Sequence, residues 1–217
     1  MVLAESVSHA AELLDEATAR DPSDPDQRLD RNLLVAAALR EILEHEPVVV
    51  GGTAEDFWTV DEYHETDLDV VTWSLTHEEQ ALLRDLGFQR EGRHWVHGPS
   101  GVPVEIPESA LKGDAGRVHH EPAGRGMAAI ISAEDLYLER VRECTMDRTT
   151  EEPTEYHSAL AIAASNYDRM EWDYIDEVIR TQKDVTPGAM EAIDRRVRRT
   201  LRRKLAGPPG RTNRKRR

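Results

Sequence analysis

VVVGGTAEDFWTVDEYHETDLDVV, residues 48–71, joins an apolar strand, a glycine pair and a second strand that carries two carboxylates. The run Val48–Val50 is short, apolar and β-branched, and it is bounded by proline and glycine, which predicts a buried strand. Gly51 and Gly52 let the backbone approach a ligand closely and direct N–H groups at an anion. We therefore expect a phosphate-binding turn at the end of this strand.

The second strand carries a D-x-D motif. Because successive residues of a strand point to opposite faces, Asp67 and Asp69 share one face while Leu68 and Val70 enter the core. Two carboxylates on one face repel each other unless a cation lies between them. Mg²⁺ takes oxygen ligands and is usually held by one or two carboxylates together with substrate phosphates. The motif therefore predicts a divalent metal site.

A third acidic residue follows the same alternation in GVPVEIP, residues 101–107. Val102, Val104 and Ile106 are predicted to face the core, which places Glu105 on the opposite side of the strand. Glu105 would complete a carboxylate triad with the two aspartates.

The order of these motifs resembles the nucleotidyltransferase superfamily, the polymerase-beta-like fold. Its pattern is a glycine pair, then D-x-D, then a third Asp or Glu on a neighbouring strand. The resemblance covers Val48–Pro107, and residues 87–95 and 132–140 are similar to small stand-alone prokaryotic nucleotidyltransferase-like proteins, some of which belong to toxin–antitoxin pairs. It implies an α/β (α+β) fold, with a mixed sheet flanked by helices and a helical C-terminal region.

The resemblance also implies an activity: Mg²⁺-dependent transfer of a nucleoside monophosphate from an NTP to a hydroxyl of RNA, protein or a small molecule. Asp67, Asp69 and Glu105 are then the catalytic carboxylates and the ligands of two Mg²⁺ ions, with Mn²⁺ as the alternative ion. The residues expected to bind the nucleotide are Gly51, Gly52, Thr53 and Arg93.

A second function stays open, namely a nucleotidyltransferase-fold protein without catalysis that binds nucleic acid or a protein partner as a regulator or antitoxin. His64-Glu65-Thr66 precedes the D-x-D motif, where similar proteins often carry an arginine, so an acid replaces a phosphate-facing cation. Arg90, Arg93 and His94 lie between the acidic strands, where a cation can meet a triphosphate. A hairpin that exposes charged side chains explains them equally well.

Two other groups favour structural interpretations. His119-His120-Glu121 has no second cluster of matching spacing, so a polar loop is expected there rather than a metal site. Trp73, Trp95 and Trp172 lie within apolar patterns and are expected in the core.

Helical patterns over residues 2–20 and 25–45 precede the strands, with a further helix near 76–86 and a hairpin through Trp95 and Val104. These patterns predict four parts, listed here in chain order: a nucleotidyltransferase-like domain with N-terminal helices at 1–131, a helical region at 132–185, a basic amphipathic helix at 186–206 and a flexible basic tail at 207–217.

Charge is distributed unevenly along the chain. The net charge is −14, yet residues 195–217 contain only basic and neutral residues, with 12 Lys or Arg. A basic amphipathic helix with a basic tail can bind phosphate backbones without sequence preference. It can equally fold against the acidic body or stay solvated. The candidate contacts to RNA or another nucleic acid are Arg195, Arg198, Arg199, Arg202, Arg203 and Lys204.

Composition indicates a cytoplasmic protein without a membrane partner. Apolar residues make up 39% of the chain, and no run approaches the roughly 18 apolar residues of a membrane span. The first 20 residues read as an acidic amphipathic helix rather than a signal peptide. Cys144 is the only cysteine, which excludes an intrachain disulfide and makes a cysteine-based zinc site implausible, so it is expected to be an inert helix residue.

Overall fold

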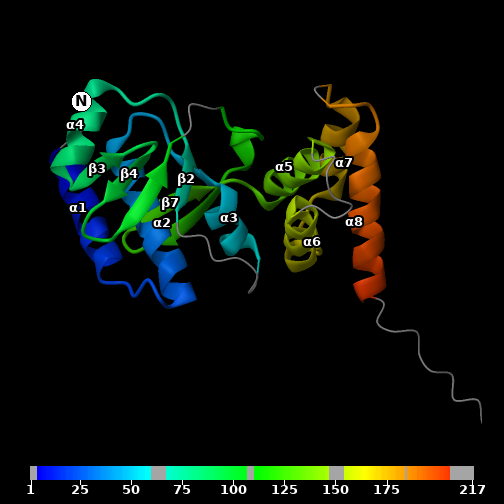
Figure 1. Ribbon diagram of the computed structural model, residues 1–217, viewed down its shortest axis with the longest axis horizontal. Helices are drawn as coiled ribbons and strands as arrows, with labels where there is room; N and C mark the ends of the chain where they lie inside the picture. Colours follow the sequence, from blue (N-terminus) through cyan, green and yellow to red (C-terminus); the bar gives the residue numbers. More distant parts are fainter. Residues whose placement is uncertain (1–3, 60–66, 107–109, 147–153, 184, 206–217) are drawn as a thin grey trace, which may run out of the picture. The chain divides into compact units, whose positions relative to one another are not determined.

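The computed structural model describes residues 4–59, 67–106, 110–146, 154–183 and 185–205 (Figure 1). These residues form two units, the first ending at Leu136 and the second beginning at Tyr137. A mixed sheet with helices makes up the first unit, and the second is helical. The predicted mixed α/β class with a helical C-terminal region is therefore confirmed.

The first unit alternates helices and strands. Its elements are α1 (Ala4–Thr18), α2 (Pro25–Ile42), β1 (Val48–Val50), α3 (Gly51–Trp58), β2 (Leu68–Val71), α4 (His77–Asp85), β3 (Phe88–Glu91), β4 (His94–His97), β5 (Val102–Glu105), a 3₁₀ turn at Ala115–Arg117, β6 (His119–Ala123), β7 (Gly126–Ile130) and the start of α5 (Ala133–Met146).

The described strands form one sheet in the order β3-β4-β5-β2-β1-β7-β6. Strand β1 pairs with β7 in parallel, and β2 pairs with β5 in parallel. The remaining neighbours are antiparallel, including the predicted hairpin in which Trp95 lies opposite Val104. β3 and β6 therefore form the two edges of the sheet.

One face of the sheet is covered by α1 and α2. Gly126 marks how closely these helices approach, because an added Cβ there would lie 2.9 Å from Leu13 of α1 and 3.2 Å from Ala37 of α2. Apolar side chains on this face are fully buried, and they include Val49, Leu68, Val70, Val102 and Val104. The core of the first unit thus lies between the sheet and these two helices.

The opposite face carries half-buried residues, among them Asp69, His94 and Glu105. The alternation predicted for the D-x-D strand and for β5 is confirmed, since the apolar residues at 68, 70, 102 and 104 are buried. Ile106 lies just beyond β5 and is only half-buried.

Local signals define the helix ends. Asp24 caps α2, because its side chain accepts hydrogen bonds from the backbone N–H groups of Asp26 and Gln27, and Pro25 occupies the first turn. Thr76 and Glu79 form a reciprocal capping box at the start of α4. Both helices lie where the apolar pattern predicts them.

The second unit consists of the remainder of α5 together with α6 (Thr154–Asn166), α7 (Trp172–Thr181) and α8 (Ala189–Leu205). Gly188 adopts a φ of +76°, so α8 begins at Ala189 rather than at the proline two residues earlier. The predicted apolar stripe of α8 is buried at Met190, Val197 and Leu201, which fixes this helix within its unit.

A buried polar network joins α5 to α8. The Tyr137 hydroxyl donates a 2.8 Å hydrogen bond to Asp194 Oδ1, and Arg198 Nε donates to the same oxygen at 2.8 Å. Arg198 also pairs with Asp176 and lies 4.5 Å from the centre of the Trp172 ring. Burial, and next the Asp194 carboxylate, raise the pKa of Tyr137 well above its usual value.

Cys144 is buried in α5, and burial raises the pKa of its thiol to about 12. Because the thiolate is the reactive form, burial and a raised pKa disfavour reaction of this cysteine in the folded protein. Among the helices that the structure describes, none is both long and apolar enough to cross a bilayer.

We expect Asp194→Ala to lower the free energy of unfolding by about 2–4 kcal/mol, because it leaves the buried Tyr137 hydroxyl without its acceptor and removes a partner of Arg198. Urea unfolding measures the change. Glu191→Ala is the matched control: it lies on the same helix, is exposed, and pairs with Arg195 only at 4.0 Å. Equal stability of the two variants would contradict a structural role for the network.

Candidate functional site

Three side chains of the kinds that bind metal ions meet on the sheet. His94 lies in β4 and Glu105 in β5, and Asp67 directly precedes β2. His94 Nε2 lies 3.6 Å from Glu105 Oε2 and 4.0 Å from Asp67 Oδ2. One ligand atom of each residue lies within 4.8 Å of the others, and all three side chains are half-buried. Among the described residues, no other three His, Cys, Asp or Glu residues gather in this way. We refer to Asp67, His94 and Glu105 as the acidic–histidine cluster.

Strand register produces this cluster. Glu105 lies opposite His94 in the antiparallel β4–β5 pair and beside Asp69 in the parallel β2–β5 pair. Paired residues of adjacent strands point to the same face, so these three side chains share the half-buried face of the sheet. Asp67 precedes β2 by one residue and joins the same face by alternation.

Asp69 is a residue of β2, and its carboxylate lies beside Gly51, the first residue of α3. Gly51 has a φ of +62°, and a Cβ added to it would lie 2.3 Å from Asp69 Oδ2. Only glycine fits both the left-handed backbone and this close approach. The N-terminal end of a helix carries partial positive charge, which favours a carboxylate beside it. The glycine pair therefore opens a helix directly, and its first residue adjoins the D-x-D motif.

Thr53 holds the backbone next to Asp67. Its buried hydroxyl donates a 3.0 Å hydrogen bond to the Asp67 carbonyl oxygen and accepts one of 3.2 Å from Asn32 Nδ2. The structure therefore places this predicted nucleotide-binding residue beneath the site, where it links α2, α3 and the D-x-D segment.

Arg93 lies at the mouth of the cluster. Its Nε is 3.1 Å from Glu105 Oε2, while 70% of its side chain is exposed. A guanidinium in this position offsets the repulsion between the acidic groups and can also meet an anion from solvent. Of the predicted site residues, Asp67, Asp69, Glu105 and Arg93 are thus brought together with the glycine pair.

His94 belongs to the cluster, although the sequence suggested it only as a cation that could meet a triphosphate. The sequence predicts a hairpin through Trp95 and Val104 but not its register, and it is the observed register that places residue 94 opposite residue 105. Two carboxylates and an imidazole fit a divalent ion: carboxylate oxygens suit Mg²⁺ and Mn²⁺, and imidazole nitrogen suits Mn²⁺ less well than it suits later transition metals.

Two structural expectations were wrong. His119, His120 and Glu121 lie on edge strand β6 rather than in a loop, because they pair in register with β7. His119 contacts Glu121 at 2.9 Å, and His120 contacts Glu46 at 3.1 Å, so the histidines form separate pairs. Trp73 is 72% exposed instead of in the core.

The basic residues of α8 do not all face solvent. Arg198 belongs to the buried polar network, and Arg196 lies 4.6 Å from the centre of the Tyr156 ring. The exposed cations of this helix, which we call the basic face of α8, are Arg195, Arg199, Arg202, Arg203 and Lys204. His64, Glu65 and the basic tail from residue 207 lie outside the described residues.

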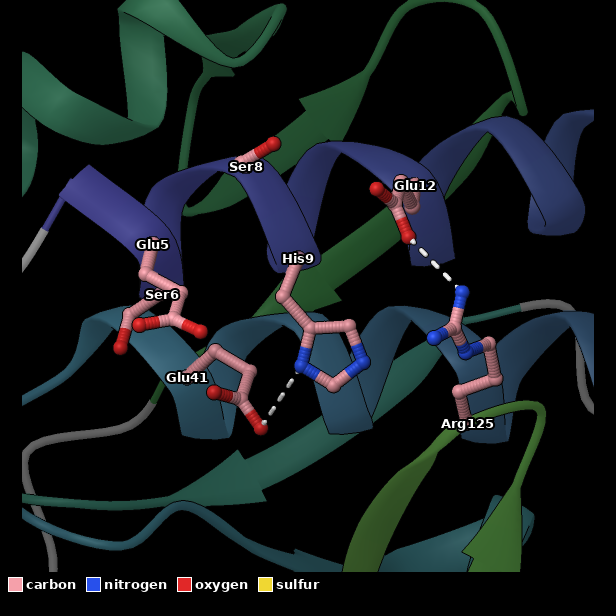
Figure 2. Close-up of a pocket in the computed structure, with 7 residues that line it drawn as sticks. All are labelled: Glu5, Ser6, Ser8, His9, Glu12, Glu41 and Arg125. Carbon is pink, nitrogen blue, oxygen red and sulfur yellow. Dashed lines mark ion pairs between the residues drawn. The ribbon is translucent and has the colours of Figure 1, made fainter.

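A separate surface pocket of about 480 Å³ lies over α1 and α2. Figure 2 shows His9 of α1 turned toward Glu41 of α2, at 3.5 Å, and Arg125 turned toward Glu12, at 3.6 Å. Its lining contains three glutamates against one arginine, with the remainder being His9 and two serines. None of the predicted site residues belongs to it, and its charge disfavours a phosphate.

The fold is similar to solved structures at low sequence identity. An antigenic nucleotidyltransferase-like protein from Paracoccidioides brasiliensis aligns with a TM-score of 0.52 and 13% identity, over 77% of this chain and 94% of its own. The antibiotic-resistance factor ANT(2'')-Ia aligns with 13% identity over 80% of this chain and 95% of its own. Its TM-score is 0.44, which is too low to bear on the fold. No protein-family model and no curated protein matches the chain. The chain has a nucleotidyltransferase-like fold, as its motifs predict.

We expect Gly51→Ala to lower the free energy of unfolding by about 1–3 kcal/mol more than Gly92→Ala. Both glycines have a φ of +62°, so both variants share the cost of the left-handed backbone. Only at Gly51 would the new Cβ meet Asp69, whereas nothing lies within 4 Å at Gly92. Urea unfolding of the two variants measures the difference, and equal losses would show that the approach to Asp69 is not constraining.

Proposed function

Because the chain has a nucleotidyltransferase-like fold, we propose that it is a Mg²⁺-dependent nucleotidyltransferase, with Mn²⁺ as the alternative ion. It moves a nucleoside monophosphate from an NTP to a hydroxyl acceptor. The observation that carries this proposal is the convergence of Asp67, His94 and Glu105 on the face of the sheet where Asp69 adjoins Gly51. Carboxylates this close to one another repel unless a cation lies between them, and carboxylate oxygens are the ligands that a divalent ion such as Mg²⁺ takes.

Asp67, Asp69 and Glu105 are the residues that would hold two divalent ions, and His94 adds a nitrogen to the same set. Ions held by these residues would neutralise charge on the triphosphate and would lower the pKa of the acceptor hydroxyl. The acceptor oxygen forms a bond to the α-phosphorus, the bond between the α-phosphorus and the bridging oxygen breaks, and pyrophosphate leaves with the electron pair while the hydroxyl proton passes to solvent. This reaction needs no nucleophile from the protein.

Arg93 and the first turn of α3 would bind the phosphates. The guanidinium of Arg93 is mostly exposed and lies at the edge of the cluster. Gly51 and Gly52 open α3 without side chains and without a side-chain cap from Val50, which would let a phosphate approach the first turn next to Asp69. Thr53 contributes by holding the Asp67 backbone in place.

The cellular setting extends this proposal. We place the protein in the cytoplasm, where NTPs are available. The proposed acceptor classes are RNA, a protein and a small molecule. Some nucleotidyltransferase-like proteins with similar motifs belong to toxin–antitoxin pairs, and we propose the same for this chain. A second protein would then be its binding partner.

The test compares wild type with Asp67→Asn, Asp69→Asn and Glu105→Gln, using α-³²P-labelled NTPs with Mg²⁺ or Mn²⁺ and total RNA or cell protein as acceptors. Each change is expected to lower label transfer by about 100-fold or more, because several kcal/mol of charge stabilisation is lost. Mn²⁺ binding, followed by loss of the free-ion EPR signal, is expected to weaken in the same variants and in His94→Gln.

Glu121→Gln is the control, since it removes an acid from an edge strand outside the site. Transfer by all variants at the wild-type rate would overturn the assignment of the site. Absence of both transfer and Mn²⁺ binding in wild type would favour the non-catalytic regulator or antitoxin instead.

A second activity, nucleic-acid binding, is supported by the basic face of α8. Five cations are exposed there, and of these Arg195 contacts Glu191 of its own helix. A surface of this kind binds phosphate backbones largely through counterion release. It would bring an RNA acceptor to the protein, or act alone if the chain does not catalyse transfer.

We expect replacement of Arg199, Arg202 and Arg203 by glutamine to weaken RNA binding and to reduce the slope of log affinity against log salt by about 2 to 3, because about 0.7–0.9 is lost for each phosphate contact. Fluorescence anisotropy with labelled RNA between low and high salt measures the slope. A control triple variant takes the same charge from the first unit, with glutamine at Arg28, Lys112 and Arg125. An unchanged slope in the α8 variant would exclude this surface.

A further inference from the structure

A cavity of about 280 Å³ adjoins the acidic–histidine cluster. Glu105 belongs to the cluster and also lines the cavity, and Arg93, whose Nε lies 3.1 Å from Glu105 Oε2, lines the cavity as well. Its other walls come from the segment after β2, from α4 and from the β3–β4 hairpin, including Trp73, Gln80, Arg90 and Trp95.

Its aromatic wall has one exposed ring. Trp73 is 72% exposed, although His45 lies against it with ring centres 5.1 Å apart. Trp95 is buried and lies 5.8 Å from the Arg90 guanidinium. An exposed indole is costly to leave in water, whereas it offers a stacking surface to a planar ligand.

The charge of the cavity differs from that of the surrounding unit. Arg90 and Arg93 are its cations, and Glu105 is its only acidic lining residue among those described. By contrast, the pocket over α1 and α2 is lined by three glutamates. Two guanidiniums beside an exposed ring fit a ligand that combines an anionic group with a planar ring.

We propose that this cavity is the acceptor subsite, and that the acceptor is a single nucleotide unit. Its base stacks on Trp73, its phosphate contacts Arg90, and a sugar hydroxyl faces Glu105. The inference rests on the proposed function, because it names the acceptor class of the same site. The volume lies just below the roughly 300–1,000 Å³ of small-molecule sites, which favours one nucleotide over a bulkier acceptor in the cavity itself. A free mononucleotide and the terminal nucleotide of an RNA strand share this chemistry.

The first experiment measures binding of AMP, ribose 5-phosphate and inorganic phosphate by calorimetry, in EDTA and without NTP. AMP is expected to bind more tightly than ribose 5-phosphate, and Trp73→Ala to weaken AMP binding by about 5-fold or more while sparing ribose 5-phosphate. Arg90→Gln is expected to weaken both ligands. Arg125→Gln removes another exposed arginine, which lies outside the cavity, and should leave both affinities unchanged.

The second experiment repeats the AMP titration with a saturating non-hydrolysable NTP and Mg²⁺. Retained AMP affinity supports an acceptor subsite, whereas displacement by the NTP assigns the cavity to the donor and overturns the proposal. A short RNA with a free 3′ hydroxyl is compared with AMP in the same titration. Binding by the RNA at least about 10-fold tighter identifies a strand end as the source, and weaker binding identifies the free nucleotide.

The proposal is also overturned if AMP does not bind at about 10 mM, or if Trp73→Ala and Arg90→Gln bind it as wild type does. These outcomes are independent of the proposed function, because the first titration needs neither metal nor transfer. If the protein binds AMP through Trp73 but transfers no label, the subsite is supported and the proposed activity fails. If it transfers label but does not bind AMP in this way, the activity is supported and the subsite fails.

Discussion

The close approach of the Gly51 backbone to the Asp69 carboxylate governs the arrangement of the site. Gly51 directly follows the last residue of β1 and begins α3, so its position fixes where the helix starts relative to β2. Strand pairing of Val50 with Asp69 sets the same relation from the side of the sheet. The Thr53 hydroxyl then ties α3 to the residue that begins the D-x-D motif. Replacing the glycine would disturb all three links together, because no side chain fits between the helix and the carboxylate.

Short-range patterns in the sequence predicted much of this site. Alternation of apolar and acidic residues was enough to place the aspartates and Glu105 opposite the core, because burial leaves only one register in which Leu68 and Val104 are both inside. Helix ends followed from capping residues such as Asp24 and Thr76. These features are encoded within a few residues of each other, and so a single sequence reveals them.

Long-range pairing was harder to anticipate. His94 joins the cluster through its place opposite Glu105, which depends on the hairpin register rather than on any motif. The exposure of Trp73 likewise depends on where the chain passes after β2. In α8, Asp194 interrupts the apolar stripe and accepts hydrogen bonds from both Tyr137 and Arg198. Arg198 also pairs with Asp176, so this arginine is not part of the solvent-facing basic surface that the sequence suggested. Tertiary partners, not the local pattern, decide the role of each of these residues.

The edges of the sheet also shape how the molecule meets other chains. Each edge strand leaves one row of backbone groups without a neighbouring strand, which is the usual starting point for strand-to-strand aggregation. In β6 the edge carries Pro122, which has no N–H to offer an incoming strand, and in β3 it carries Gln89, Arg90 and Glu91, all exposed. A charged or donor-poor edge of this kind resists extension by a second copy. We therefore expect both edges of the seven-stranded sheet to disfavour strand pairing with a second copy of the chain.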